Sequence, residues 1–434
     1  MAVTPLVAIV GRPNVGKSSL FNRLIGQRQA ITHDVAGTTR DANYGQVTWN
    51  GRSVMLADTA GMHSTKDELE LRAIDQIQEV ADVAQLIVIV TDATTMLTNE
   101  DRQVARMALK TGKPVILALN KLDGGGQKPA DNFERLGVKQ MIATSAIHGR
   151  GTGDLLDAIT EVTGSAKPAE QTEGITIALL GRPNVGKSSI LNSLVGKQQA
   201  ITSEVAGTTR DTGIATVRYH QKPIRILDTA GLRRRGKIEG GVEKYSALRT
   251  LAAITQADVC IVVMDATELG VAGDQHIAGQ VIEAGKGLVL VVNKWDAIEK
   301  ETGTQELLSR KLMRDFAFAH WAPLVFTSAT EGSNIAKLME LITQISERRK
   351  TTIPTGELNR LIEQLTTAQP PAGLKGKRPK IKYATQIDTD PPTFGVHSSY
   401  PTLIHFSYQR YLENGLRDAY DFTGTPVKIS FKGK

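Results

Sequence analysis

The chain has 434 residues, more than a single hydrophobic core usually serves, so we expect two or three domains. Hydrophobic residues make up 41% and charged residues 22%, and no apolar run is long enough for a membrane span, as in an ordinary soluble protein. The single cysteine, Cys260, excludes a disulfide within the chain and a cysteine-based metal site and fits a reducing cytoplasm, while the net charge of +7 permits a polyanionic partner.

The first part of the chain alternates between strand patterns and helix patterns. Short apolar runs predict strands at 6–10, 53–57, 85–90 and 114–120. Helical spacing of apolar residues predicts helices at 18–24, 68–80, 100–108 and 153–162. The first run lacks a charged leader and continues into a glycine-rich motif, so we expect a strand there and no secretion signal. The alternation predicts a mostly parallel sheet with helices on both faces.

The chain then repeats itself. GRPNVGKSS at 11–19 recurs at 181–189, and VAGTTRD and DTAG recur at the same offset of 170 residues. The later motifs NKLD and TSA recur as NKWD and TSA, with the register drifting through short insertions. A period this long indicates duplicated domains. We therefore expect two similar domains at 1–163 and 175–350, a polar linker at 164–174, and a different domain at 351–434.

GRPNVGKS fits the pattern G-x-x-x-x-G-K-S between a strand and a helix, which predicts a phosphate-binding loop. Glycines let the backbone N–H groups wrap an anion, the lysine reaches the β- and γ-phosphates, and the serine hydroxyl ligates Mg²⁺. A single match could be a glycine-rich turn that fits the pattern by chance. Two matches in register make that alternative improbable. The predicted residues are Gly11, Asn14, Val15, Gly16, Lys17, Ser18 and Ser19, and Gly181, Asn184, Val185, Gly186, Lys187, Ser188 and Ser189.

DTAG and TTRD predict the rest of a magnesium and γ-phosphate site. An aspartate at a strand end can hold Mg²⁺ through water, the glycine N–H can contact the γ-phosphate, and the threonine can complete the magnesium shell. The alternative is that each threonine only caps a turn. The predicted residues are Asp58, Thr59, Gly61 and Thr39 in the first copy and Asp228, Gly231 and Thr209 in the second.

NKxD predicts the choice of base. The aspartate carboxylate accepts hydrogen bonds from guanine N1–H and the exocyclic amine, and adenine would leave it unpaired, so GTP is expected to be strongly preferred over ATP. The asparagine joins loops, the lysine stem packs over the base, and TSA offers a backbone N–H to guanine O6. The predicted residues are Asn120, Lys121, Asp123, Ser145 and Ala146, and Asn293, Lys294, Asp296, Ser328 and Ala329.

A glutamine that orients the attacking water in many GTP-hydrolysing enzymes is replaced here by Met62 and Leu232. Asn14 and Asn184 in the phosphate loops could instead hold a monovalent cation against the phosphates, or they could only shape the loops. The predicted catalytic groups are Asn14, Lys17, Thr39 and Gly61, and Asn184, Lys187, Thr209 and Gly231. After the second DTAG, the basic cluster at 233–237 is either a solvated loop or a contact surface for RNA or protein.

The last domain has a different pattern. We expect a helix at 356–366, strands at 380–386, 393–396 and 426–431, and a helix at 407–420, which together form a small α+β domain. Eleven Lys and Arg against seven Asp and Glu give 351–434 a net charge of +4. The cluster of Lys375, Lys377, Arg378 and Lys380 is typical of phosphate contacts, with a plain surface loop as the alternative.

These paired motifs and the tail KYATQ…PPTF…SYQRYLEN…LRDAYDFTGTPVKISF resemble the Der (EngA) family of bacterial ribosome-assembly GTPases, within the wider TrmE-Era-EngA-like group. The resemblance covers the whole chain. It implies two tandem Ras-like P-loop GTPase domains of α/β fold and a carboxy-terminal α+β KH-like domain. It also implies a switch helix within GKIEGGVEKYSALRT.

The resemblance further implies a function. We expect hydrolysis of GTP to GDP and phosphate with Mg²⁺ and stimulation by K⁺. We expect the large ribosomal subunit and rRNA as partners, neither membrane nor DNA, a cytoplasmic location, and a monomer off the ribosome. The family usually continues PPTF with an apolar strand, so GVHSSYPTL predicts a shorter or more polar central strand here.

One other function remains open, and a third is disfavoured. The segments after the two DTAG motifs differ, so the chain could be a nucleotide-gated binding platform in which one copy binds GTP and barely hydrolyses it. A tRNA-modification or membrane-remodelling GTPase is disfavoured, because such proteins carry one GTPase domain beside large helical regions.

Overall fold

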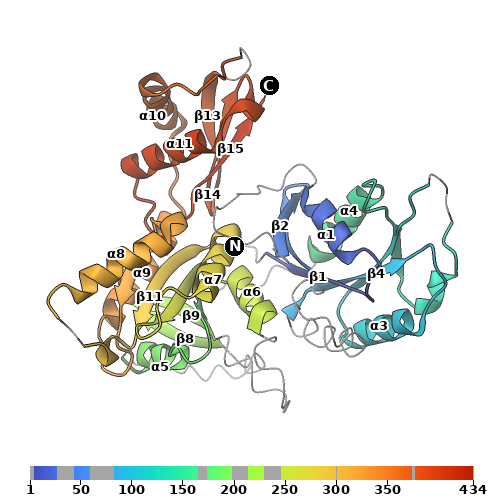
Figure 1. Cartoon of the computed structure of the whole chain (residues 1–434), viewed down its shortest axis with the longest axis horizontal. Coiled ribbons are helices and arrows are strands. Elements are labelled where there is room, and N and C mark those ends of the chain that lie inside the picture. Colours follow the sequence, from blue (N-terminus) through green and yellow to red (C-terminus); the bar gives the residue numbers. More distant parts are fainter. Residues whose placement is uncertain are drawn as a thin grey trace. The chain divides into compact units, whose positions relative to one another are not determined.

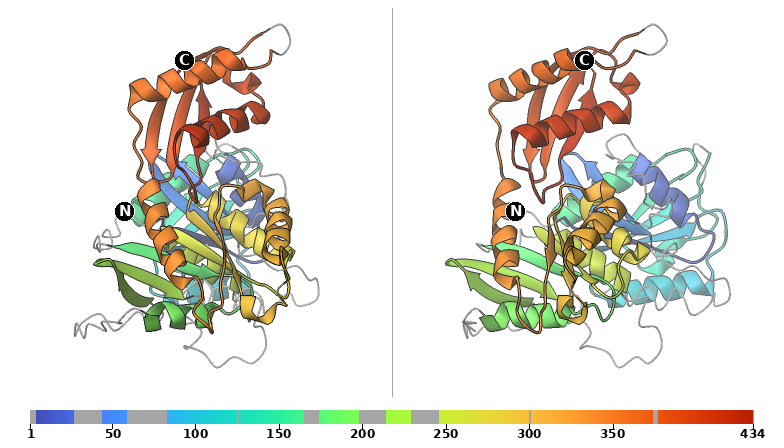
Figure 2. Two further views of the ribbon diagram at one scale, coloured as in Figure 1. Left: turned by 90° about the vertical axis from the view of Figure 1, so that its left-hand side faces the viewer. Right: turned by 60° about the vertical axis from the view of Figure 1, so that its left-hand side comes forward.

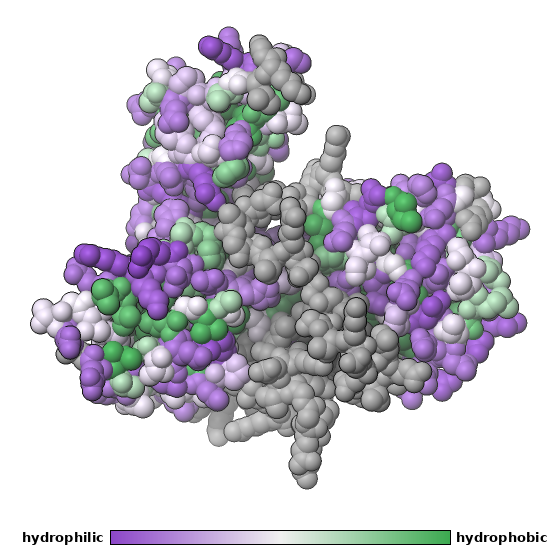
Figure 3. Space-filling view, viewed as in Figure 1, coloured by the Kyte–Doolittle hydropathy of each residue, from purple (hydrophilic) through white to green (hydrophobic). Residues whose placement is uncertain are grey.

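The computed structural model describes residues 4–26, 44–58, 83–124, 126, 128–164, 174–197, 214–228, 246–299, 301–373 and 377–433. The chain divides into two compact units. The first contains Met1–Thr172 and Arg235–Gln256, and the second contains Glu173–Arg234 and Ala257–Lys434. Among the described residues, no helix is both long enough and apolar enough for a membrane crossing. Hydrophilic side chains predominate on the coloured surface in Figure 3.

The first unit is built on a six-stranded sheet with the order β2-β3-β1-β4-β5-β6 (Figure 1). Only β2 runs antiparallel to its neighbour. The elements are β1 Leu6–Val10, α1 Lys17–Gly26, β2 Tyr44–Trp49, β3 Arg52–Asp58, β4 Leu86–Asp92, α3 Asn99–Lys110, β5 Val115–Asn120, the short 3₁₀ helix η1 Phe133–Leu136, β6 Gln140–Ala143 and α4 Thr152–Gly164. The predicted helix at 68–80 lies outside the described residues.

Burial explains why the central strands read as continuous apolar runs. Every residue of β1 and β4 is buried, because helices cover both faces of a parallel sheet. α1 contributes Leu20 and Leu24 and α4 contributes Leu155 and Ile159 to one hydrophobic cluster with the strands. The edge strand β2 is less buried: Tyr44 and Val47 are buried, and its other four residues are only partly buried.

The second unit repeats this sheet with the order β8-β9-β7-β10-β11-β12. Its first strand, β8, is the antiparallel one. The elements are β7 Ile175–Leu180, α5 Lys187–Lys197, β8 Ile214–Tyr219, β9 Lys222–Asp228, β10 Val259–Asp265, α7 Ala272–Glu283, β11 Gly287–Asn293, η3 Trp295–Ala297, α8 Thr304–Asp315, η4 Ala317–Ala319, β12 Leu324–Phe326 and α9 Ile335–Arg348. Helix α6, Ser246–Gln256, groups with the first unit. The predicted pair of α/β domains is confirmed.

The carboxy-terminal domain is a three-stranded sheet with two helices (Figure 2). β14 lies in the centre, antiparallel to β13 and parallel to β15. The elements are α10 Thr355–Ala368, β13 Ile381–Thr389, β14 Pro392–Ser398, η5 Pro401–Leu403, α11 Phe406–Ala419 and β15 Lys428–Lys432. β14 extends beyond the predicted strand at 393–396. β14 has seven residues, and Phe394 and Val396 are fully buried, because the apolar residues needed for the core occur at alternate positions.

Within the second unit, the carboxy-terminal domain is docked against the GTPase-like domain by backbone hydrogen bonds and ion pairs. The Leu288 N–H of β11 donates to the Gly424 carbonyl (2.9 Å), and the Gly424 N–H donates to the Trp321 carbonyl (2.9 Å). Arg349, 2% exposed, donates to the Gly285 carbonyl (2.9 Å) and pairs with Asp390. These contacts join the two domains directly.

Candidate nucleotide-binding sites

The predicted motifs meet at one edge of each sheet. In the first sheet, the phosphate loop follows β1, Asp58 ends β3, Asn120 ends β5 and Ser145 follows β6. These strands are parallel and close together in the sheet order, so their carboxyl ends face the same side. Ligands of such sheets bind at this edge. The second copy has the same arrangement around β7, β9, β11 and β12.

Both phosphate loops depend on a glycine that no other residue can replace without strain. Gly16 has φ +93°, and a Cβ on it would lie 2.4 Å from Asn120 Nδ2. Gly186 has φ +96°, and a Cβ there would lie 2.1 Å from Asn293 Nδ2. The backbone can therefore pass close to the asparagine and present its N–H groups outward. The exposed serines that follow lie in the first turns of α1 and α5, where helix N–H groups favour an anion.

Asn14 and Asn184 adopt the left-handed conformation, with φ of 65° and 64°. Asparagine tolerates this region better than most residues. Both side chains are exposed on their loops. Their positions are thus consistent with a loop-shaping role and leave the amide groups accessible to a cation.

Lys17 is buried and held over the loop. Its Nζ donates to the carbonyl oxygens of Gly11 (2.8 Å) and Arg12 (2.7 Å). Burial lowers the pKa of Lys17 to about 8, although the negative charge of Asp58 acts to raise it. In the second copy, Lys187 Nζ donates to the equivalent carbonyls of Gly181 (2.7 Å) and Arg182 (2.6 Å). A lysine held in this way can exchange carbonyl partners for phosphate oxygens.

Ser18 and Asp58 come together although they are 40 residues apart. The Ser18 hydroxyl donates to Asp58 Oδ2 at 2.6 Å, and Asp58 is 2% exposed. A hydroxyl and a carboxylate side by side supply the oxygen ligands that Mg²⁺ prefers. In the second copy, Ser188 lies at the start of α5 and Asp228 ends β9. In the described residues, no group of three or more His, Cys, Asp or Glu could hold a metal by itself.

Asn120 joins the phosphate loop to the loop that follows β6. Its Nδ2 donates to the Val15 carbonyl (2.9 Å), and its Oδ1 accepts from the Ala146 N–H (3.0 Å). Asn293 makes the same two bonds, to Val185 (3.0 Å) and from Ala329 (3.2 Å). The predicted joining role therefore has a matching geometry in both copies.

The other residues of NKLD are also fixed. The Ser145 hydroxyl donates to Asp123 Oδ1 at 2.6 Å, which orients the carboxylate. Lys121 has φ 71°, and its Nζ donates to the Asn14 carbonyl (2.8 Å) and to Asp92 Oδ2 (2.6 Å). In the second copy, Lys294 pairs with Asp265 at 2.6 Å, and Asp296 lies in the short helix η3.

Sequence reasoning missed Asp92 and Asp265, the partners of the motif lysines. Burial acts to raise the pKa of Asp92, but the hydrogen bonds from Lys121 and Thr94 outweigh it and lower the pKa. The pKa of Asp265 is lowered against burial in the same way by Lys294 and Thr267. The signal was present, because the sequence DAT follows β4 and β10 in both copies.

Several predicted residues lie outside the described part of the chain. They are Thr39, Thr59 and Gly61, Thr209 and Gly231, the substituted positions Met62 and Leu232, the cluster Arg233, Arg234, Arg235 and Lys237, and Lys375. Helix α6 contains the last residues of the predicted switch segment.

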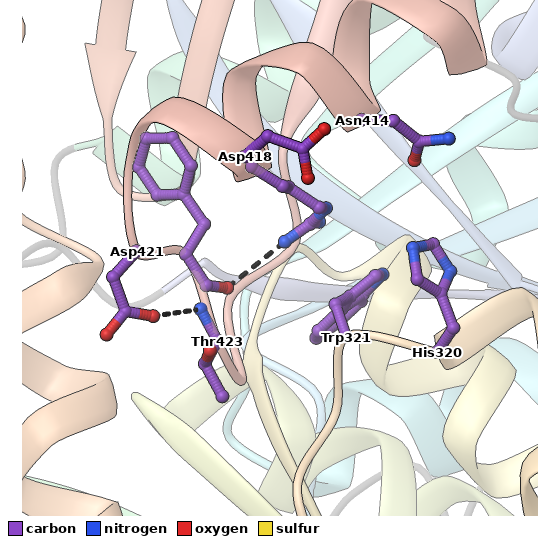
Figure 4. Close-up of a pocket in the computed structure, with 8 residues that line it drawn as sticks. His320, Trp321, Asn414, Asp418, Asp421 and Thr423 are labelled. Atoms are coloured by element: carbon purple, nitrogen blue, oxygen red, sulfur yellow. Dashed lines mark hydrogen bonds between the residues drawn. The ribbon is translucent and has the colours of Figure 1, made fainter.

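A separate cavity of about 440 Å³ lies where the carboxy-terminal domain meets its neighbour in the second unit (Figure 4). Arg417 lies over the Trp321 ring at 5.0 Å and donates to the Phe422 carbonyl at 3.1 Å. Asp421 accepts from the Thr423 N–H at 3.0 Å. The lining contains no residue of the phosphate or guanine motifs, so this cavity is distinct from the candidate nucleotide sites.

Comparison with known proteins agrees with this geometry. A family described as "50S ribosome-binding GTPase" matches residues 6–121 and 176–294, and one described as "KH-domain-like of EngA bacterial GTPase enzymes, C-terminal" matches 352–432. A protein named GTPase Der from Chloroflexus aggregans is 45% identical over 99% of this chain and 98% of its own. GTPase Der from Caldicellulosiruptor saccharolyticus is 41% identical over 99% of both chains.

Among solved structures, a point variant of Era from Aquifex aeolicus bound to GDP.AlF4- is 21% identical, with a TM-score of 0.31, over 61% of this chain and 94% of that chain. At this level the structural match adds nothing to the family relationship.

Proposed function

The chain belongs to the Der (EngA) family of GTPases, and from this premise we propose that it is a switch with two GTP sites that acts in assembly of the large ribosomal subunit. The observation that carries the proposal is that both phosphate loops have a glycine, Gly16 or Gly186, where the backbone passes so close to an asparagine side chain that a Cβ would clash. Both copies keep this loop geometry, so we assign nucleotide binding to both. The accompanying domain boundaries are 1–163, 175–350 and 351–434, with a linker at 164–174.

We assign the phosphates to the loop backbone and to Lys17 and Lys187. Each lysine is held by two carbonyl oxygens that phosphate oxygens can replace. We assign Mg²⁺ to the Ser18 hydroxyl and the Asp58 carboxylate, since Ser18 Oγ and Asp58 Oδ2 lie 2.6 Å apart. Because the motifs repeat, we assign Ser188 and Asp228 to Mg²⁺ in the second copy. When bound, Mg²⁺ neutralises charge on the phosphates. Thr39, Thr209, Gly61 and Gly231 complete the assignment from the sequence.

Guanine selectivity is assigned to Asp123 and Asp296. Ser145 holds one carboxylate oxygen of Asp123, so the carboxylate has a fixed orientation toward the base. A carboxylate that guanine pairs and adenine leaves unpaired in the closed site gives strong discrimination.

We further propose that K⁺ stimulates hydrolysis through Asn14 and Asn184. The exposed amides lie on the phosphate loops, and a cation there would add positive charge beside the leaving group. We propose that this cation compensates for the water-orienting glutamine, which the sequence replaces with Met62 and Leu232. Hydrolysis is then expected to be slow without a partner.

The proposed partners are the large ribosomal subunit and its rRNA, contacted partly through the basic carboxy-terminal domain. Its net charge of +4 and its match to a KH-like family support this role. We propose a cytoplasmic protein that is monomeric away from the ribosome, with no membrane or DNA partner.

The test is sedimentation of the full chain with purified 50S subunits, in the presence of a non-hydrolysable GTP analogue or of GDP. We expect co-sedimentation that depends on the nucleotide. Equal recovery of the protein with 30S and 50S subunits in both nucleotide states would refute the proposal.

A further inference from the structure

The sheet of the carboxy-terminal domain has one face that its own helices do not cover. Ala384, Phe394, Val396 and Ile429 point toward α10 and α11 and form the core with them. Side chains alternate along strands, so the intervening positions point the other way. We call the surface formed by Tyr383, Thr385, His397, Ser430 and Lys432 the outer face.

An aromatic pair lies on this outer face. The rings of Tyr383 and His397 stack with centroids 4.2 Å apart and an interplanar angle of 14°. Tyr383 is nevertheless 46% exposed, so part of its ring is accessible to solvent. His397 is paired in register with Tyr383 on one side and with Lys432 on the other. An aromatic side chain and a cation therefore flank the same histidine.

The surroundings of this pair are basic. Residues 377–387 contain four Lys or Arg and no acidic residue, and residues 428–433 contain two lysines and no acidic residue. The basic segment stays beside the Tyr383 end of the sheet, because the Lys380 and Ser399 backbones are joined by a bond of 3.1 Å. Asp388, the acidic residue of β13, lies at the opposite end of that strand. The exposed cations are Lys377, Arg378, Lys380, Lys382 and Lys432.

We propose that the outer face binds a short single-stranded RNA segment, with one base stacked on the open side of Tyr383 and a neighbouring phosphate paired with Lys432. Aromatic rings interleaved with cations are the chemistry that holds single strands, and bases within a duplex are not available for such stacking. The charge of the segments complements a polyanion. This inference deepens the rRNA role proposed above and rests on it.

The test uses the full chain with Mg-GDP and a fluorescein-labelled 12-nucleotide oligoadenylate, followed by anisotropy. Loss of one base stack corresponds to between about 5- and 140-fold weaker binding, so we expect that range for Tyr383→Ala. Tyr383→Trp keeps a stacking surface and should restore binding. Phe406→Ala is the matched control, because Phe406 is 59% exposed under Arg410 at the start of α11. We expect that control to bind like the wild type.

Salt dependence separates stacking from charge. Tyr383→Ala should weaken binding without changing the slope of log affinity against log salt. Lys432→Gln should lower the magnitude of that slope by about 0.7, the value for one phosphate contact on a single strand. Wild-type affinity in Tyr383→Ala, or an equal loss in Phe406→Ala, would overturn the inference.

The 50S sedimentation assay distinguishes this failure from failure of the proposed function. If the wild type sediments with 50S subunits and Tyr383→Ala binds oligoadenylate normally, only the stacking surface is wrong. If the wild type does not sediment with 50S subunits, the ribosomal role fails, and with it this inference.

Discussion

Replacing Asn120 with alanine removes the side chain that joins the first phosphate loop to the loop after β6. Asn120 is 1% exposed and makes two bonds, to the Val15 carbonyl and from the Ala146 N–H. Alanine can make neither bond. The two loops on either side of the nucleotide then lose the side chain that bridges them.

The expected magnitude follows from the two backbone groups that are left unpaired. Each unsatisfied buried group costs about 1–3 kcal/mol, so the competent arrangement of the loops should lose roughly 2–6 kcal/mol. The smaller value already corresponds to about 30-fold weaker nucleotide binding. The larger value would apply if neither the Val15 carbonyl nor the Ala146 N–H forms a hydrogen bond with a water molecule in the variant.

The assay is an equilibrium titration with a fluorescent GDP analogue, read as the number of tight sites per chain. We expect two sites in the wild type and one in either Asn120→Ala or Asn293→Ala, since Asn293 makes the equivalent bonds in the second copy. Asn132→Ala is the control, because Asn132 is an exposed asparagine that caps the short helix η1 away from the phosphate loop. Two unchanged tight sites in a folded Asn120→Ala protein would refute the reasoning.

Four further outcomes are expected. Asp123→Asn combined with Asp296→Asn should shift preference from GTP toward xanthosine triphosphate, and unchanged GTP turnover in a phosphate-release assay would contradict the base assignment. Lys17→Ala and Lys187→Ala, assayed separately, should each lower GTP turnover; equal losses would eliminate the platform with one non-hydrolysing copy. Replacing K⁺ with Na⁺ at constant ionic strength should slow hydrolysis, and an unchanged rate would remove the phosphate-loop asparagines from the mechanism. Because burial lowers the pKa of Lys17 to about 8 from its ordinary 10.5, the folded nucleotide-free protein binds fewer protons than the unfolded chain between these values. Its free energy of unfolding should therefore receive a contribution from Lys17 that rises with pH across that window, and urea titrations at pH 8 and 10 should show a smaller rise in Lys17→Met.

The sequence was sufficient to predict the two α/β domains, because both copies of the repeat show the same alternation of strand and helix patterns. The apolar runs at 6–10 and 85–90 correspond to the central strands β1 and β4, whose residues are all buried, as expected for a parallel sheet. The motif residues also meet as the strand order requires, since Asn120 ends β5 and lies against the loop at Val15.

Other features depend on contacts that no local pattern encodes. The central strand β14 formed in full although GVHSS is unusually polar, because Phe394 and Val396 alone supply its core face. The docking of the carboxy-terminal domain joins Leu288 and Gly424, which lie far apart in sequence, and no local pattern indicates that they meet. Burial of Arg349 beside Asp390 likewise needed three-dimensional information.

The bond from Leu288 to Gly424 has a practical consequence for hydrogen exchange. Leu288 is the second residue of β11, and its amide N–H donates to the Gly424 carbonyl of the carboxy-terminal domain. A chain ending at Lys350 would lack the Gly424 carbonyl, so this one amide would exchange with deuterium faster while the neighbouring strand amides keep their partners. Leu288 is thus a single-residue reporter of the separation of these two domains within the second unit.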